Sequence, residues 1–110
     1  MFDRISTRAI LNAAARFPVV AILGARQVGK TTIARRAFPS FTYRDLEDPR
    51  TAERFRADPR FALDEAGSNG LILDEAQAIP ELFAAMRGAV DDQRSRNGRF
   101  VLLGSAQPTL

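Results

Sequence analysis

The sequence is 110 residues long, with 45% hydrophobic residues, 26% charged residues and a net charge of +3, as in an ordinary globular domain or part of one. It has no cysteine and no histidine, which excludes a disulfide framework and removes the usual ligands of zinc. It has no apolar run of membrane-spanning length and no secretory signal, so we expect a cytoplasmic protein with no membrane partner.

Arginine supplies almost all of the positive charge. Lysine and arginine together number 16, and Lys30 is the only lysine. The arginines are spread along the chain among 13 acidic residues, which favours a mixed, solvated surface over a basic patch. A nucleic-acid partner therefore stays open without specific support, and we expect most arginines at the surface.

The first two predicted elements are a helix and a strand. Ser6 or Thr7 can cap a helix that runs to about Arg16, and Pro18 ends it. We expect its apolar side to consist of Ile10, Leu11, Ala14 and Phe17. Residues 19–23 are all apolar, which predicts a central strand that is covered on both faces.

Residues 24–31 read G-A-R-Q-V-G-K-T and match the phosphate-binding pattern G-x-x-x-x-G-K-[ST]. The strand precedes them, and a helix is predicted from Lys30 to Ala37, with Pro39 behind it. Glycines allow the backbone N–H groups to turn toward an anion, and the helix N-terminus adds partial positive charge. The predicted nucleotide-binding residues are Gly24, Ala25, Arg26, Gln27, Val28, Gly29, Lys30, Thr31 and Thr32.

Two of these residues have specific expected roles. We expect the Lys30 ammonium to reach the β- and γ-phosphates of ATP, because a compact ammonium suits this position better than a guanidinium. The Thr31 hydroxyl coordinates Mg²⁺. Arg26 either contacts phosphate or is solvated, and solvation is the commoner state of such a side chain.

The middle of the sequence predicts a strand and two short helices. Residues 41–46 alternate loosely, which indicates a second strand. Asp-Pro-Arg occurs at 48–50 and again at 58–60, and each copy places an Asp at an N-cap and a Pro at the first helical position. We therefore expect helices over 49–57 and 59–66, with Phe55, Phe61 and Leu63 packed inward.

A third predicted strand, residues 70–75, ends in two carboxylates, Asp74 and Glu75. An acid at the carboxyl end of a parallel strand lies on the same sheet edge as a phosphate loop. We expect Asp74 to hold Mg²⁺ and Glu75 to orient and deprotonate an attacking water. The role of Gln77 is open. A helix from Pro80 to about Ser95 follows, with an apolar stripe of Leu82, Phe83, Met86 and Val90.

Residues 99–103 predict a fourth strand, with a loop at 104–108. Ser105 lies on the same edge and could sense the γ-phosphate or position the water. Gln107 is its rival for that role, and an ordinary capping serine is the alternative. Strands that alternate with helices in this way indicate parallel βαβ units and an α/β fold.

The motifs together resemble a known family. They are 24–32 (G-A-R-Q-V-G-K-T-T), 46–49 (L-E-D-P), 71–77 (L-I-L-D-E-A-Q), 80–83 (P-E-L-F) and 103–105 (L-G-S). This combination resembles the predicted ATPases of the AAA+ superfamily in bacteria and archaea, which carry a C-terminal domain of unknown function. The resemblance implies a three-layer P-loop NTPase fold of the ASCE type, with a mostly parallel sheet in strand order 5-1-4-3-2. It also implies Walker A at 24–31, Walker B at 71–75 and a sensor-1 position at Ser105.

The resemblance further implies that residues 1–110 are the N-terminal part of one ATPase domain, truncated after the fourth strand. The fifth strand, the arginine finger, the second sensor and the C-terminal domain are then expected beyond Leu110. Assembly with further copies would use an arginine finger that this sequence does not contain. The first strand would lie at an edge of the sheet, which predicts poor solubility of this fragment by itself.

The function expected from these observations is Mg²⁺-dependent binding and hydrolysis of ATP, with Glu75, Lys30 and Ser105 as the catalytic residues. One alternative is a nucleotide-binding switch that hydrolyses little. Another is a helicase-like, DNA-dependent ATPase, because residues 74–77 and 104–106 resemble helicase motifs.

Overall fold

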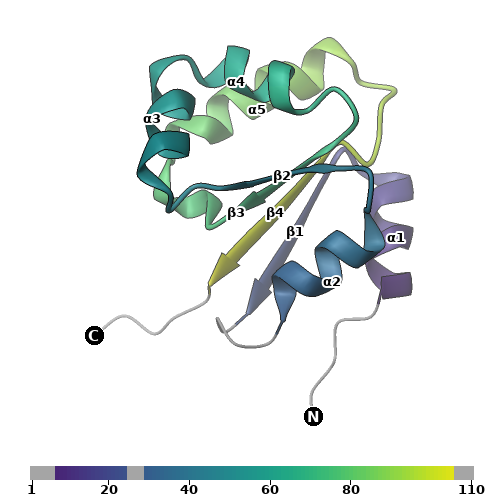
Figure 1. Cartoon of the computed structure of the whole chain (residues 1–110). Helices are drawn as coiled ribbons and strands as arrows, with labels where there is room; N and C mark the ends of the chain where they lie inside the picture. The colour runs from purple at the N-terminus through teal and green to yellow at the C-terminus, as the bar shows by residue number, and fades with distance from the viewer. Residues whose placement is uncertain (1–6, 25–28, 106–110) are drawn as a thin grey trace.

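Parallel pairing joins all the strands of the computed structural model, which describes residues 7–24 and 29–105 (Figure 1). The strands of the described part are β1 (Val19–Gly24), β2 (Thr42–Asp45), β3 (Leu71–Asp74) and β4 (Phe100–Ser105). They form a four-stranded sheet in the order β1-β4-β3-β2. This α/β architecture confirms the predicted P-loop NTPase-like fold and the 1-4-3-2 part of the expected strand order.

The helices are α1 (Thr7–Arg16), α2 (Lys30–Ala37), α3 (Pro49–Ala57), α4 (Pro59–Ala66) and α5 (Glu81–Asp92), with a 3₁₀ turn, η2, at Ala76–Ala78. The first four agree with the predicted ranges. Most boundaries of the other elements differ from the prediction by one residue, and two differ by more. The last helix ends at Asp92 rather than near Ser95, and the fourth strand continues through Gly104 and Ser105 because both pair with the end of β1.

The helices cover the two faces of the sheet as separate layers (Figure 1). Strand alternation explains the division, because successive side chains of a strand point to opposite faces. In β3, Leu71 and Leu73 pack with α3, α4 and α5, whereas Ile72 packs with α1 and α2. In β4, Phe100 likewise faces the first group and Val101 the second. The two central strands are therefore apolar throughout because both of their faces are buried.

Strand β1 is less buried than the sequence predicts. Ile22 is buried, but Ala21 and Leu23 are exposed, and 64% of Leu23 is accessible. In the described structure β1 pairs on one side only, with β4, and of its residues only Val19 packs against the core that α3, α4 and α5 cover. The prediction of a strand covered on both faces was therefore wrong at Ala21 and Leu23.

Four aromatic or aliphatic residues predicted to face the core are exposed instead: Leu11, Phe17, Phe61 and Phe83. The spacing of the buried residues explains the difference. Leu82 and Met86 lie four residues apart on one face of α5, and Phe83 is turned about 100° away from Leu82. In α4 the buried residues are the neighbours Ala62 and Leu63, and Phe61 lies outside this buried face.

The two Asp-Pro-Arg repeats form the predicted caps. The Asp48 carboxylate accepts a hydrogen bond from the backbone N–H of Arg50 at 3.0 Å. The Asp58 carboxylate accepts one from Phe61 N–H at 3.2 Å. Each carboxylate thus satisfies a backbone donor that the first helical turn leaves unpaired.

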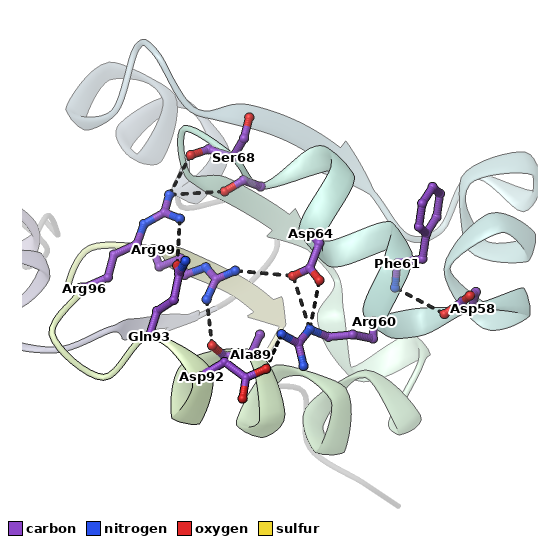
Figure 2. Close-up of polar contacts among 11 residues, drawn as sticks. Asp58, Arg60, Phe61, Asp64, Ser68, Ala89, Asp92, Gln93, Arg96 and Arg99 are labelled. Carbon is purple, nitrogen blue, oxygen red and sulfur yellow. Dashed lines mark hydrogen bonds and ion pairs between the residues drawn. The ribbon is translucent and has the colours of Figure 1, made fainter.

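Arg99 is buried, against the expectation of a surface arginine, with only 5% of it exposed (Figure 2). Its guanidinium donates to the carbonyl of Ala89 at 2.7 Å and to the Asp64 carboxylate at 3.3 Å. Arg60 joins the cluster by pairing with Asp64 at 3.0 Å and with Asp92 at 2.6 Å. Burial lowers the pKa of Arg99 from its ordinary value. This ionic cluster ties α4 to α5 and to the start of β4.

Candidate functional site

The carboxyl edge of the sheet brings the predicted site residues together. Because all the strands are parallel, they end at the same edge, where open α/β sheets bind their ligands. Gly24 at the end of β1 lies opposite Ser105 in β4. Asp74 ends β3, Glu75 follows it directly, and α2 begins after the loop from β1.

The helix that follows the loop has an N-terminus unlike those of α3 and α4. Gly29 precedes α2 with φ of 77°, a left-handed conformation that favours glycine. No side chain of the described residues caps α2, and its first turn contains no acidic residue. The backbone N–H groups of this turn are therefore not occupied by a carboxylate, and their partial positive charge is available to an anion.

Lys30, the first residue of α2, is buried with 4% of it exposed. Its ammonium donates a hydrogen bond to the carbonyl of Gly24 at 3.2 Å, so it reaches back to the end of β1. The residues between these two positions, Ala25, Arg26, Gln27 and Val28, lie outside the described residues, as does Gln107. Thr32, also predicted to contact nucleotide, has an exposed side chain.

One oxygen of the Asp74 carboxylate accepts hydrogen bonds from two hydroxyl groups. Thr31 Oγ1 donates to Asp74 Oδ2 at 2.9 Å, and the hydroxyl of Tyr43 donates to Oδ2 at 2.5 Å. Thr31 and Asp74 therefore lie in contact, although they are 43 residues apart in the sequence. Tyr43 was not predicted as a site residue.

The chemistry of these groups fits Mg²⁺. Hydroxyl and carboxylate oxygens are hard ligands, and Mg²⁺ in nucleotide sites takes one or two of them together with phosphate oxygens and water. A hydroxyl has one donor and two acceptor positions, so Thr31 can donate to Asp74 and still offer a lone pair to a metal. The described residues contain no group of three or more acidic, histidine or cysteine side chains that would hold a metal by itself. A metal here would therefore depend on its nucleotide.

Glu75 has a strained backbone, and each oxygen of its carboxylate accepts a hydrogen bond. Its φ of 56° and ψ of 49° are left-handed, a conformation rare outside glycine, asparagine and aspartate. Only 6% of the residue is exposed. Ser105 Oγ donates to Oε2 at 2.9 Å, and Gln77 Nε2 donates to Oε1 at 2.6 Å. The structure thereby joins three residues that the sequence named separately.

Gly104 provides the space for this arrangement. A Cβ atom at this position would lie 3.1 Å from Oε1 of Gln77 and 3.0 Å from Cδ2 of Leu23. Both distances are tighter than ordinary van der Waals contact. A larger residue at 104 would therefore press on the amide that donates to Glu75.

Tyr43 is the site residue that sequence reasoning missed. Burial, followed by the hydrogen bond to Asp74, raises the pKa of Tyr43 well above its ordinary value, so its hydroxyl stays protonated and donates. The sequence offered one signal: Tyr43 is the only tyrosine, on a strand in which neighbouring positions are polar. Its partner lies on the adjacent strand, so the contact depends on the sheet order.

Comparisons with known proteins agree with this geometry. A family model described as an AAA domain matches residues 16–110. The uncharacterized protein Mb2031c of Mycobacterium bovis and the uncharacterized protein Rv2008c of Mycobacterium tuberculosis are each 48% identical over 99 residues, which is 86% of this chain and 21% of theirs. The chain thus spans about a fifth of the length of these relatives.

No solved structure matches it, and among the described residues no helix is long and apolar enough to cross a membrane. The family match covers most of the sequence, and the chain therefore belongs to the AAA domain family of nucleotide-binding, ATPase-like proteins.

Proposed function

We propose that the carboxyl edge of this sheet binds Mg-ATP and hydrolyses it. The observation that carries the proposal is the pairing of two sets of side chains at one edge: Thr31 with Asp74, and Glu75 with Ser105. The first set has the oxygen groups that a nucleotide-bound metal requires, and the second has a carboxylate held in a fixed orientation. The N-terminus of α2, with no side-chain cap, supplies positive charge beside them.

In this proposal the groups of the site have separate roles. The N–H groups at the start of α2 and the Lys30 ammonium hold the phosphates. Thr31 and Asp74 hold the metal, which when bound neutralises charge on the phosphate oxygens. Glu75 orients a water and takes its proton as the water attacks the γ-phosphorus and the bond to the β-phosphate oxygen breaks. Ser105 keeps the carboxylate of Glu75 turned toward that water.

A second candidate function, a nucleotide-binding switch with little turnover, has its own support. Both oxygens of Glu75 already accept hydrogen bonds, one from Gln77 and one from Ser105. A carboxylate held at both oxygens is less free to accept a proton from water. A helicase-like activity, assembly through an arginine finger and a cytoplasmic location stay predictions.

Binding is tested first, with Lys30 variants of the full-length protein and a fluorescent ATP analogue. We expect Lys30→Ala to abolish measurable affinity for the Mg-nucleotide, because the phosphates lose a buried cation. Lys30→Arg is the matched control for charge. It keeps the charge but replaces the compact ammonium with a broad guanidinium, and we expect it to bind poorly as well. Unchanged affinity in Lys30→Ala would remove the proposal.

Hydrolysis is tested with Glu75→Gln, measured as steady-state phosphate release beside the wild type. We expect turnover to fall by about 10²-fold or more, because the amide cannot accept a proton, while nucleotide affinity is retained. Equal turnover in the two proteins would contradict the hydrolytic role of Glu75 and favour the switch.

A further inference from the structure

Tyr43 reaches the candidate metal residue from a neighbouring strand. It lies in β2, which pairs with β3, and its hydroxyl donates to Oδ2 of Asp74 at 2.5 Å. Thr31 approaches from α2 and donates to the same oxygen at 2.9 Å. Two donors that converge on one oxygen from different elements fix the rotation of the carboxylate. The other oxygen, Oδ1, receives no hydrogen bond from the residues that the structure describes.

The tyrosine ring is itself held in place. The guanidinium carbon of Arg35 lies 4.9 Å from the ring centroid, a cation–π contact. Arg35 lies one helical turn after Thr31 in α2, so the same helix supplies the ring contact and the second hydroxyl. The ring also packs against the core beneath α1 and α2. The contact with Arg35 and the packing against this core therefore hold the ring that carries the hydroxyl.

We propose that Tyr43 is a positioning residue for the metal of the nucleotide site. Its hydroxyl holds Asp74 in the rotamer that leaves Oδ1 available to Mg²⁺ or to a water bound to Mg²⁺. Hydrogen-bonding partners of metal ligands orient those ligands, and their loss typically lowers metal affinity about 10- to 100-fold. This inference rests on the proposed function, because it concerns the metal that accompanies the nucleotide.

A purely structural role for Tyr43 makes a different prediction. In that case the hydroxyl would only tie the edge strand β2 to β3. Its loss would then lower the thermal stability and would weaken nucleotide binding equally with and without Mg²⁺. A positioning role changes the dependence on Mg²⁺ alone. The two roles are separated by measuring binding across a range of Mg²⁺ concentrations.

The experiment uses Tyr43→Phe in the full-length protein, because phenylalanine keeps the ring and removes the hydroxyl. Binding of a fluorescent ATP analogue is titrated with MgCl₂ and repeated in EDTA, and thermal unfolding is recorded for each protein. We expect the Mg²⁺ concentration for half-maximal binding to rise about tenfold, with affinity in EDTA unchanged. Thr42→Val is the matched control. It removes a hydroxyl from the adjacent β2 position, which faces the other side of the sheet, and should leave the Mg²⁺ dependence as in the wild type.

Each contrary result has a distinct meaning. The same Mg²⁺ dependence in Tyr43→Phe and wild type would overturn the positioning role while leaving the proposed function intact. A parallel loss of binding with and without Mg²⁺, together with a lower unfolding temperature, would also overturn it in favour of a structural role. Nucleotide binding by the wild type that does not respond to Mg²⁺ at all would overturn the proposed function and this inference with it.

Discussion

At the scale of single residues, Glu75 combines a functional side chain with an unfavourable backbone conformation. Among the described residues it is the only non-glycine with positive φ. Such a conformation costs about 1 to 2 kcal/mol for an ordinary residue and much less for asparagine. The fold therefore gives up stability at the position where the carboxylate must meet Ser105 and Gln77.

This strain predicts an order of stability for two variants. Glu75→Asn and Glu75→Ala both remove the carboxylate, but only asparagine adopts the left-handed conformation readily. We expect the asparagine variant to have the higher free energy of unfolding, by about 1 kcal/mol, in urea denaturation. Glu53, exposed in α3, is the control position, where alanine should be the more stable replacement because it favours a helix. The same order at both positions would contradict the argument.

At the scale of elements, the helices use acidic residues in two ways. Asp48 and Asp58 cap α3 and α4, and Asp64 pairs with the buried guanidinium of Arg99 (Figure 2). Helix α2 has no such residue at its start. Acidic side chains thus cap α3 and α4, whereas α2 starts with no side-chain cap and no acidic residue of its own in the first turn.

The Asp64 pair gives a stability prediction. Asp64→Ala removes the carboxylate partner of Arg99. Because Arg99 is only 5% exposed and stays charged, we expect the free energy of unfolding to fall by about 2 kcal/mol. Asp91→Ala is the control, because Asp91 and its partner Arg94 are both exposed and 4.0 Å apart. That change should cost less than about 1 kcal/mol. Both variants are measured by chemical denaturation. A similar loss of unfolding free energy in the two would show that the Arg99 pair stabilises the fold no more than an exposed ion pair does.

At the scale of the whole molecule, the sheet carries a partly uncovered strand. In the part of the chain that the structure describes, β1 has β4 on one side, and Leu23 on it is 64% exposed. An apolar surface lies between this strand and α1; its lining includes Ala9, Ala13, Val20 and Leu23. Strand edges with exposed apolar side chains are ready to pair with another chain.

We therefore expect residues 1–110, produced by themselves, to self-associate through β1. Leu23→Lys should reduce the association, because a charged side chain on an edge strand opposes pairing. Phe61→Lys is the control, since Phe61 is similarly exposed at 61% but lies on α4, away from this edge. Light scattering over a range of concentrations measures the effect. Equal reduction by both changes would indicate a general solubility effect rather than pairing at β1.

The sequence predicted the elements well because their signals are local. The apolar runs, the Asp-Pro caps and the glycines of the loop each act within a few residues, and the parallel direction of the strands then followed from their alternation with helices. The strand order, by contrast, was implied by the family resemblance. Tyr43 and Gln77 could not be assigned in this way. Each contacts a carboxylate through a geometry that only the assembled sheet or a left-handed turn creates. Arg99 was predicted at the surface for a similar reason, since its partners Asp64 and Ala89 lie on other elements.

The composition of the chain has a practical consequence at Lys30. This residue has the only lysine amine of the sequence, and it is buried at the start of α2 beside Gly24. A reagent that acylates amines therefore has one side-chain target within these residues. The rate at which Lys30 is modified then reports the state of the site, because bound phosphates would shield the amine and slow the reaction. A mass shift on the peptide that contains Lys30, which separates it from the N-terminal amine, would then report occupancy of the site without a tag or a fluorescent nucleotide.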